Sequence, residues 1–234
     1  FSAHQFSVTV PPDVWVDILN FTLSHQEESG PAHERHAPGF RPDGQEAPKD
    51  HARGFMYIKG SPDRHEGKAT GSMTACGVAN LVMAKDVLLE SKKGKKRWTA
   101  QGFETRVHTG VLDGLAWLDL HWSATQNPGH SNYHLYYLYG VERAMDLIGK
   151  QLIGKHVWYN EGAVAILGRL QQVQAKDPTD PAAEAQKAVF WTDRSHEPKD
   201  VLATCFALLF LKRATKDIID VPVTAGEGRP ADNR

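Results

Sequence analysis

Apolar side chains recur every three or four residues through most of the chain, and almost no segment shows the strict alternation of a β-strand. This spacing places the apolar side chains on one face of a helix. The last apolar segment is apolar nearly all round, which predicts a helix enclosed on most sides. The pattern predicts an all-α fold with helices over residues 12–26, 73–89, 111–125, 131–145, 157–172 and 200–215.

Polar residues, glycine and proline mark the ends of these helices. The basic run at 92–97 predicts a solvated turn after the second helix. The Asn-Pro-Gly sequence at 127–129 predicts the end of the third helix. Ser131 or Asn132 suits the N-cap of the fourth.

Two long segments, 27–70 and 175–199, have low helix propensity. Loops of this length in a compact domain are either functional lids or mobile insertions. The polar stretch at 221–234, which contains glycine and proline, predicts a flexible C-terminal tail. The expected organisation is one domain over residues 1–220 with two long insertions, followed by that tail.

An internal repeat links three of the predicted helices. Residues 134–144 match residues 204–214 at a spacing of 70 positions, with apolar or aromatic residues paired and Arg-Ala shared at the end. A further shift of 59 positions places Ser131 on Ser72, so the helix at 73–89 is an earlier copy. The repeated helices are more apolar than those between them, as in helical hairpins arranged in a ring.

Four segments carry a resemblance to a known family: 71–81, 134–144, 158–162 and 204–214. They resemble the prenyltransferase and squalene-oxidase repeats of bacterial proteins with a terpenoid cyclase-like α/α toroid. The resemblance covers about residues 10–215 and implies a ring of inner and outer helices, commonly six pairs. The chain supplies about three pairs. This implies a partial toroid, completed by a further segment or another chain, or left open as an arc.

The catalytic motifs of that family are absent from the sequence. Squalene-type cyclases use an Asp-rich motif before an inner helix, and here Ala203 precedes Thr204 where such relatives often carry Asp. Cys76 and Cys205 occupy equivalent repeat positions, but neither has the Asp and His with which protein prenyltransferases hold zinc. The resemblance therefore implies a non-catalytic scaffold or binding module with no cofactor. It would engage a partner protein or a ligand through its concave face or its insertions.

In a toroid, the starts of the inner helices surround one mouth of the central cavity. An alternative is an enzyme on this fold, a polysaccharide lyase or hydrolase or an isoprenoid-processing enzyme, with Tyr133, His134 and Asp200 as acid–base groups. In the competing interpretation these tyrosines pack between helices with their hydroxyls satisfied locally. The resemblance places six binding residues at the cavity mouth: Ser72, Thr74, Asn132, Tyr133, His134 and Thr204.

Histidine and cysteine offer weaker candidate sites. His33 and His36 lie on one turn of the first insertion and suit a divalent metal ion together with a nearby aspartate, although incidental histidines in a solvated loop fit as well. The two cysteines are expected to be separated by the fourth helix, which argues against a disulfide and favours buried, inert thiols. The tryptophans are expected in the core.

The composition limits which classes of binding partner are expected. With 27 basic and 28 acidic side chains, the formal net charge of −1 gives no electrostatic reason to bind nucleic acid. The longest apolar stretch, 201–211, is about half of the ~20 residues that span a bilayer, so no transmembrane segment is predicted. A three-pair arc exposes inner-helix surface, which predicts a protein partner or self-association. The resemblance slightly favours an exported or periplasmic location over a cytoplasmic one.

Overall fold

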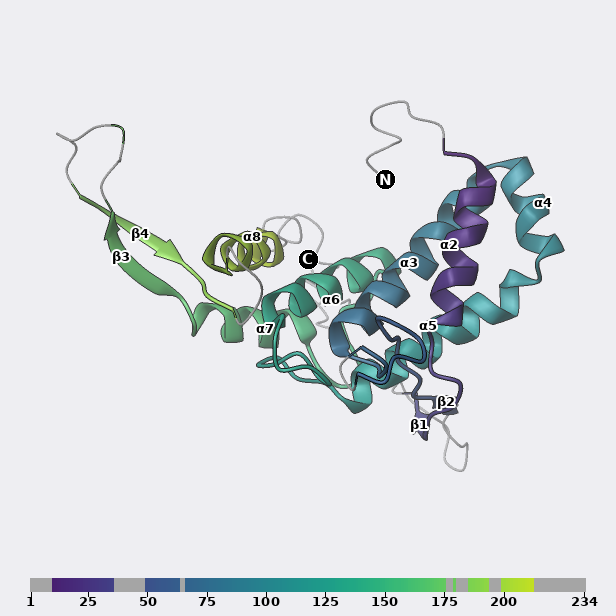
Figure 1. Cartoon of the computed structure of the whole chain (residues 1–234), viewed down its shortest axis with the longest axis horizontal. Coiled ribbons are helices and arrows are strands. Elements are labelled where there is room, and N and C mark those ends of the chain that lie inside the picture. The colour runs from purple at the N-terminus through teal and green to yellow at the C-terminus, as the bar shows by residue number, and fades with distance from the viewer. Residues whose placement is uncertain are drawn as a thin grey trace, which may run out of the picture.

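The computed structural model describes residues 10–35, 49–63, 66–175, 179, 185–193 and 199–212. Helices make up 57% of these residues, and the strands are short (Figure 1). The helices are α2 (Pro12–Ser24), α3 (Gly71–Glu90), α4 (Lys92–Ala100), α5 (Phe103–Leu120), α6 (His134–Ile148), α7 (Trp158–Leu167) and α8 (Lys199–Lys212). The strands are β1 (Ala32–Glu34), β2 (Lys49–His51), β3 (Gln171–Ala175) and β4 (Gln186–Phe190).

All six predicted helices are present, with shifted ends. The third begins earlier, at Phe103, and the fifth ends earlier, at Leu167. Residues 213–215 of the sixth, like the tail at 221–234, lie outside the described residues. The N-cap of α6 is Tyr133, so the assignment of Ser131 or Asn132 to that position was wrong.

The basic run at 92–97 forms part of α4, so the predicted turn was wrong. Ser91 ends α3 and caps α4, because its Oγ accepts a hydrogen bond from the Gly94 backbone N–H at 3.0 Å. Lysine and arginine are good helix formers. The indole of Trp98 is buried and anchors this short helix to the core.

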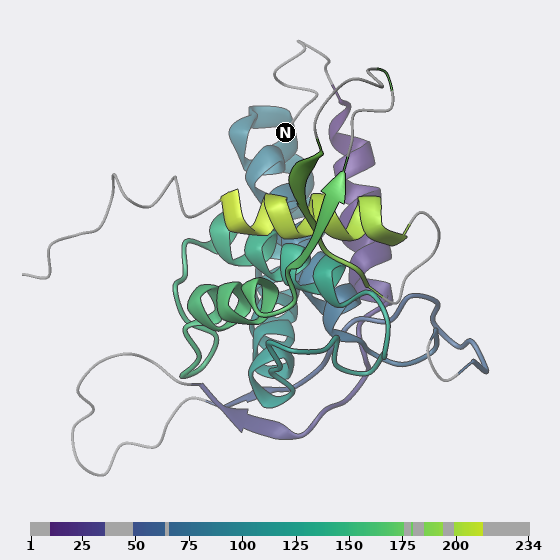
Figure 2. The same cartoon turned by 90° about the vertical axis from the view of Figure 1, so that its left-hand side faces the viewer.

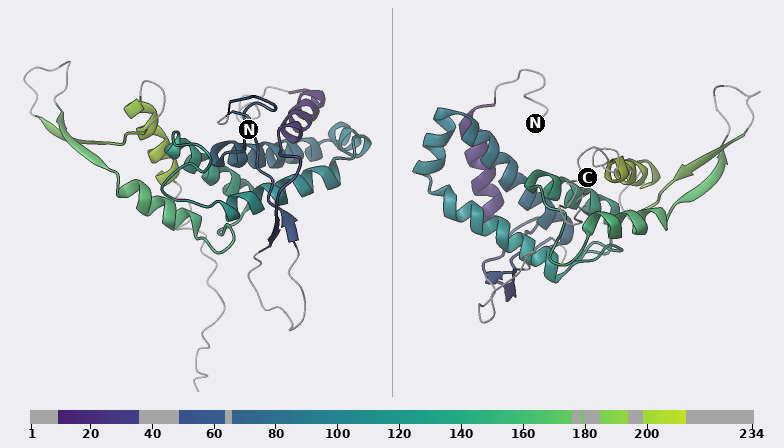
Figure 3. Two further views of the ribbon diagram at one scale, coloured as in Figure 1. Left: turned by 60° about the horizontal axis from the view of Figure 1, so that its bottom comes forward. Right: turned by 180° about the vertical axis from the view of Figure 1, so that it is seen from behind.

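The first long insertion contains a β-hairpin, and a second hairpin begins at Gln171, just before the second insertion, where residues 171–172 were predicted to end the fifth helix; the periodicity revealed neither. Strands β1 and β2 pair antiparallel with His33 opposite Asp50, and β3 and β4 pair antiparallel with Val173 opposite Ala188. Strands of three to five residues are too short to show an alternating pattern. The β3–β4 hairpin projects away from the helices and contacts α8 through β4 (Figure 3).

The repeated helices form the centre of the fold. Helix α3 packs against α2, α4, α5 and α6, and α6 also packs against α8 and α7 (Figure 2). Thus α3, α6 and α8, which the internal repeat identified as equivalents, follow one another through the domain. Trp117, Trp158 and Trp191 are buried, which confirms their predicted place in the core, whereas Trp122 is half-buried and packs against that core.

Helix α8 is not enclosed, contrary to the prediction. Ala203, Ala207 and Phe210 face the core. The opposite face presents apolar side chains that no described residue covers, namely Val201, Leu202, Leu208 and Leu209, at 60%, 41%, 54% and 44% exposed. The all-round apolar character of α8 therefore reflects two apolar surfaces, one inside the domain and one outside.

Helix α3 is the one described helix long and apolar enough to cross a membrane by length and composition. It lies in the middle of the domain with neighbours on several sides. A core helix passes the same test, so the described residues contain no clear transmembrane segment.

Candidate functional site

A pocket of about 480 Å³ opens between the first insertion and the starts of α3 and α6. Two of the predicted cavity-mouth residues, Ser72 and Tyr133, line it. The insertion adds an aromatic ring and a carboxylate that the sequence analysis did not connect with these helices. The described lining residues are Tyr57, Glu66, Thr70, Ser72, Met73, His130, Tyr133 and Tyr136.

The buried amide of Asn127 holds the two helix starts together. Its Oδ1 accepts a hydrogen bond from the Ser72 backbone N–H at 2.9 Å, and its Nδ2 donates to Ser72 Oγ and to the Asn132 carbonyl, both at 3.1 Å. Sequence reasoning identified Asn127 as a helix-stop signal and missed this role. Its partner Ser72 lies 55 positions away on α3, where no local pattern points to it.

Tyr133 occupies a strained backbone position at the pocket. It is the one non-glycine residue with positive φ in the described chain, at φ 64° and ψ 33°. A left-handed conformation costs a bulky residue of the order of 1 kcal/mol or more, so surrounding contacts must enforce it. Its ring lies against His130, with the ring centroids 5.3 Å apart.

His130 has a defined tautomer. Its Nδ1 accepts the Asn132 backbone N–H at 3.0 Å, so in the neutral ring the proton sits on Nε2. Deeper in the pocket, the Tyr136 hydroxyl lies 3.2 Å from Cys76 Sγ. Burial raises the pKa of both groups, which keeps the phenol and the thiol neutral. Cys76 is half-buried and Cys205 is exposed, so the prediction that both thiols are buried was wrong; both are free, as expected.

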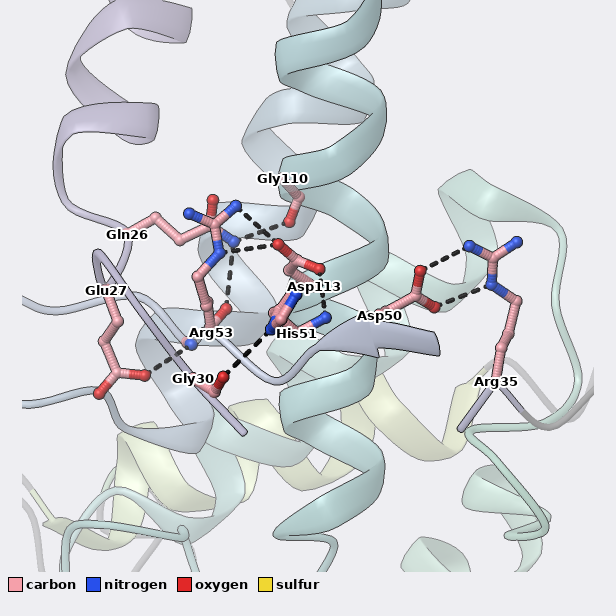
Figure 4. Close-up of polar contacts among 10 residues, drawn as sticks. Gln26, Glu27, Gly30, Arg35, Asp50, His51, Arg53, Gly110 and Asp113 are labelled. Atoms are coloured by element: carbon pink, nitrogen blue, oxygen red, sulfur yellow. Dashed lines mark hydrogen bonds and ion pairs between the residues drawn. The ribbon is translucent and has the colours of Figure 1, made fainter. Parts of the chain in front are cut away.

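The described part of the first insertion is fastened to α5 by a network of hydrogen bonds (Figure 4). The buried carboxylate of Asp113 accepts the His51 backbone N–H at 2.8 Å and Arg53 Nε at 2.7 Å. Gln26 Nε2 donates to the carbonyls of Arg53 and Gly110, at 3.1 and 2.9 Å. These bonds fix the backbone just before Tyr57 enters the pocket.

Phe55 anchors the same segment in the core. It is 2% exposed, and its ring lies directly over Gly77 of α3, where any side chain would collide with it. The Phe55 backbone N–H donates to Thr74 Oγ1 at 3.0 Å. Thr74 is fully buried and therefore secures the insertion and does not line the pocket.

The remaining predicted residues lie elsewhere. Thr204 Oγ1 accepts the Trp191 backbone N–H at 3.0 Å and holds the end of the second insertion on α8. Asn132 lies beside the pocket, with its backbone bound to Asn127 and His130. Asp200 is exposed in the first turn of α8. It is not among the described residues that line the pocket with Tyr133.

His134 is buried in a structural contact. Its Nε2 donates to the Ala124 carbonyl at 2.9 Å, and its Nδ1 accepts from Arg169 Nη1 at 2.8 Å, because a guanidinium can only donate. Both ring nitrogens are therefore engaged, and the ring is neutral. Asp193 Oδ2 accepts the adjacent Leu135 backbone N–H at 2.8 Å, a contact that reaches α6 from 58 positions away.

These contacts predict an acid-sensitive stability. Burial lowers the pKa of His134 below its ordinary value of 6.5, and the charge of Arg169 lowers it further. Well above pH 6.5 neither the folded nor the unfolded ring binds a proton, so the contact contributes fully. As the pH falls below that value, the unfolded chain takes up the proton first, and stability falls by at most about 1.4 kcal/mol per pH unit.

Urea denaturation of the wild type and of His134→Gln between pH 7.5 and 5 measures this effect. The pH slope should be smaller in the variant, in which His121 keeps its own contribution because burial lowers its pKa too. Equal slopes in the two proteins would show that His134 does not titrate on unfolding.

The predicted metal site lacks support among the described residues. His33 Nε2 lies 2.7 Å from Asp119 Oδ2, in a hydrogen bond between the first insertion and α5. His36 lies outside the described residues. Within the described ranges, no three His, Cys, Asp or Glu side chains gather as metal ligands would.

The described residues form a mostly helical protein, in which an aromatic pocket lies between the first insertion and the starts of α3 and α6. No protein-family model matches the chain, and neither curated proteins nor solved structures give a significant match.

Proposed function

We propose that the chain is a non-catalytic binding module of the prenyltransferase-repeat type, a partial α/α toroid that binds a small ligand between its first insertion and the starts of α3 and α6. One observation carries the proposal. Side chains from segments far apart in sequence converge on a pocket of about 480 Å³, within the size range of ligand sites. The repeat resemblance supports the same location, since α3 and α6 correspond to inner helices.

The buried hydrogen bonds around the pocket support binding without catalysis. Thr70 Oγ1 and Ser72 Oγ lie 3.3 Å apart, and each also accepts an N–H group, from Met73 and Asn127. Glu66 is the one carboxylate among the described lining residues. Hydrolysis of a glycosidic bond by the usual route needs two carboxylates on either side of that bond. The enzyme alternative is further weakened because His134 has no nitrogen available for proton transfer.

A binding panel tests the proposal. Isothermal titration of the chain with choline, glucose, geraniol and benzoate is expected to give a complex with at least one of them. Tyr57→Ala should weaken that complex by about tenfold or more, because the ring forms part of the pocket wall. Phe21→Ala removes an equally exposed ring from α2 and should leave binding unchanged. Failure of all four compounds to bind, or equal binding to both variants, contradicts the proposal.

The exposed face of α8 favours a second role, in self-association. Contiguous apolar surface on a folded domain commonly marks an interface. The elements next to α8 also expose apolar side chains, namely Val164 and Leu167 on α7 and Val189 on β4. The proposed occupant is a second copy of the chain, because two arcs of about three helix pairs supply the six pairs of the family ring.

Sedimentation velocity tests self-association. The wild type is expected to sediment faster as its concentration rises, because copies bury the α8 face against each other. Leu208→Glu places a charge in the middle of that face and should keep the chain monomeric. Phe21→Glu, a matched change at the far end of the domain, should behave as the wild type. A wild type that stays monomeric at every concentration refutes self-association.

A further inference from the structure

The pocket walls combine aromatic rings with a single charge. Tyr57, Tyr133 and Tyr136 line the pocket together with the carboxylate of Glu66, and no lysine or arginine is among the described lining residues. From this arrangement we infer that the pocket binds an organic cation of the quaternary-ammonium class. The inference rests on the proposed function and names the ligand class of the same site.

Tyrosine faces attract cations because the aromatic ring is negative above and below its plane. Tyr57 and Tyr136 both line the pocket. Burial raises the pKa of Tyr136, which keeps its side chain a neutral phenol. The third ring belongs to Tyr133, which stands at the start of α6 in a left-handed backbone conformation that its surroundings must enforce. A cation in this pocket can therefore contact rings from the insertion and from α6.

Glu66 supplies the charge complement. Ser61 Oγ donates to its Oε2 at 3.1 Å, and the Glu66 carbonyl accepts the Ile58 backbone N–H at 3.0 Å, so the residue is held by its own loop. The Nδ1 of His130 accepts the Asn132 backbone N–H. Among the described lining residues, Glu66 is the one carboxylate, and no lysine or arginine accompanies it.

A neutral sugar fits the walls less well. Sugar binding depends on side chains that can form further hydrogen bonds, yet both aliphatic hydroxyls of the lining and the Tyr136 hydroxyl already have partners within the protein. Thr70 Oγ1 accepts the Met73 N–H at 3.2 Å, and Ser72 Oγ accepts from Asn127 at 3.1 Å. Met73 adds a polarisable thioether, a group that packs well against methyl groups.

Choline and its uncharged carbon isostere 3,3-dimethyl-1-butanol separate charge from shape. Isothermal titration should show choline binding at least about tenfold more tightly than the isostere, since a desolvated cation–π contact is lost with the charge. Tyr57→Phe keeps the ring and should bind choline nearly as the wild type does, whereas Tyr57→Ala should lose about tenfold or more. Glu66→Gln should weaken choline binding and leave the isostere unaffected.

The outcomes of these titrations separate the inferred ligand class from the proposed function. Preference for choline together with these variant effects supports the inference. Equal binding of choline and the isostere overturns it and leaves the proposed function in place, as does pocket binding of glucose, geraniol or benzoate with no choline binding. If choline, the isostere and the rest of the panel all fail to bind, both the inference and the proposed function fall.

Discussion

Replacement of Asp113 by alanine is expected to destabilise the protein by about 2–4 kcal/mol, because it leaves one side of a buried ion pair without its partner. The Asp113 side chain is 4% exposed, and Arg53 Nη2 lies 2.6 Å from its Oδ2. The same carboxylate accepts the His51 N–H, so alanine also leaves a backbone donor unsatisfied. Urea unfolding followed by circular dichroism measures the loss.

A surface pair provides the matched control. Glu28 contacts Lys59 at 3.0 Å, but its side chain is 83% exposed, so Glu28→Ala should change stability by no more than about 0.5 kcal/mol. Asp113→Asn should recover part of the loss, because its amide oxygen can still accept the His51 N–H. If Asp113→Ala costs no more than Glu28→Ala, the network does not hold the insertion on α5.

Truncation of Trp158 to alanine is expected to cost about 3–5 kcal/mol through the cavity it leaves. The indole is fully buried at the start of α7 and packs edge-on against Phe210 of α8, with the ring centroids 6.1 Å apart. Its Nε1 donates to the Lys150 carbonyl at 3.1 Å. The side chain therefore joins α7, α8 and the loop after α6, and its loss should loosen the C-terminal half.

Leu167→Ala, on the same helix, is the control. Leu167 is 56% exposed, so its truncation should change the free energy of unfolding by no more than about 0.5 kcal/mol. Trp158→Phe keeps most of the apolar volume and should fall between the two variants. Similar losses for Trp158→Ala and Leu167→Ala would mean that α7 does not pack as described.

The sequence predicted the helices well because their apolar spacing is a local property. The stripe of Val14, Trp15 and Ile18, for example, indicates α2 without any knowledge of its neighbours. The ends were less accurate, because capping depends on backbone geometry as well as residue type. Tyr133 shows this at α6, where a left-handed residue without a side-chain cap stands in place of the expected serine or asparagine.

Only some of the residues that line the candidate site could be predicted, for a similar reason. Ser72 and Tyr133 were predicted from the sequence repeat, which places both near the start of a helix, and both line the pocket. Tyr57 and Glu66 were not found, because they belong to an insertion that carries no repeat signal. Their arrival at the pocket depends on Phe55 packing over Gly77, a contact that only the tertiary structure shows.

The sequence alone determined the helical class and the absence of the cyclase and zinc motifs, because periodicity and motif spacing are local properties of the chain. Only the tertiary structure decided that the described part of the first insertion is fastened to α5 and that the described residues leave one apolar face of α8 exposed. It also decided that His134 is a buried structural residue and not a free base. These outcomes depend on contacts between residues tens of positions apart, which a one-dimensional pattern does not encode.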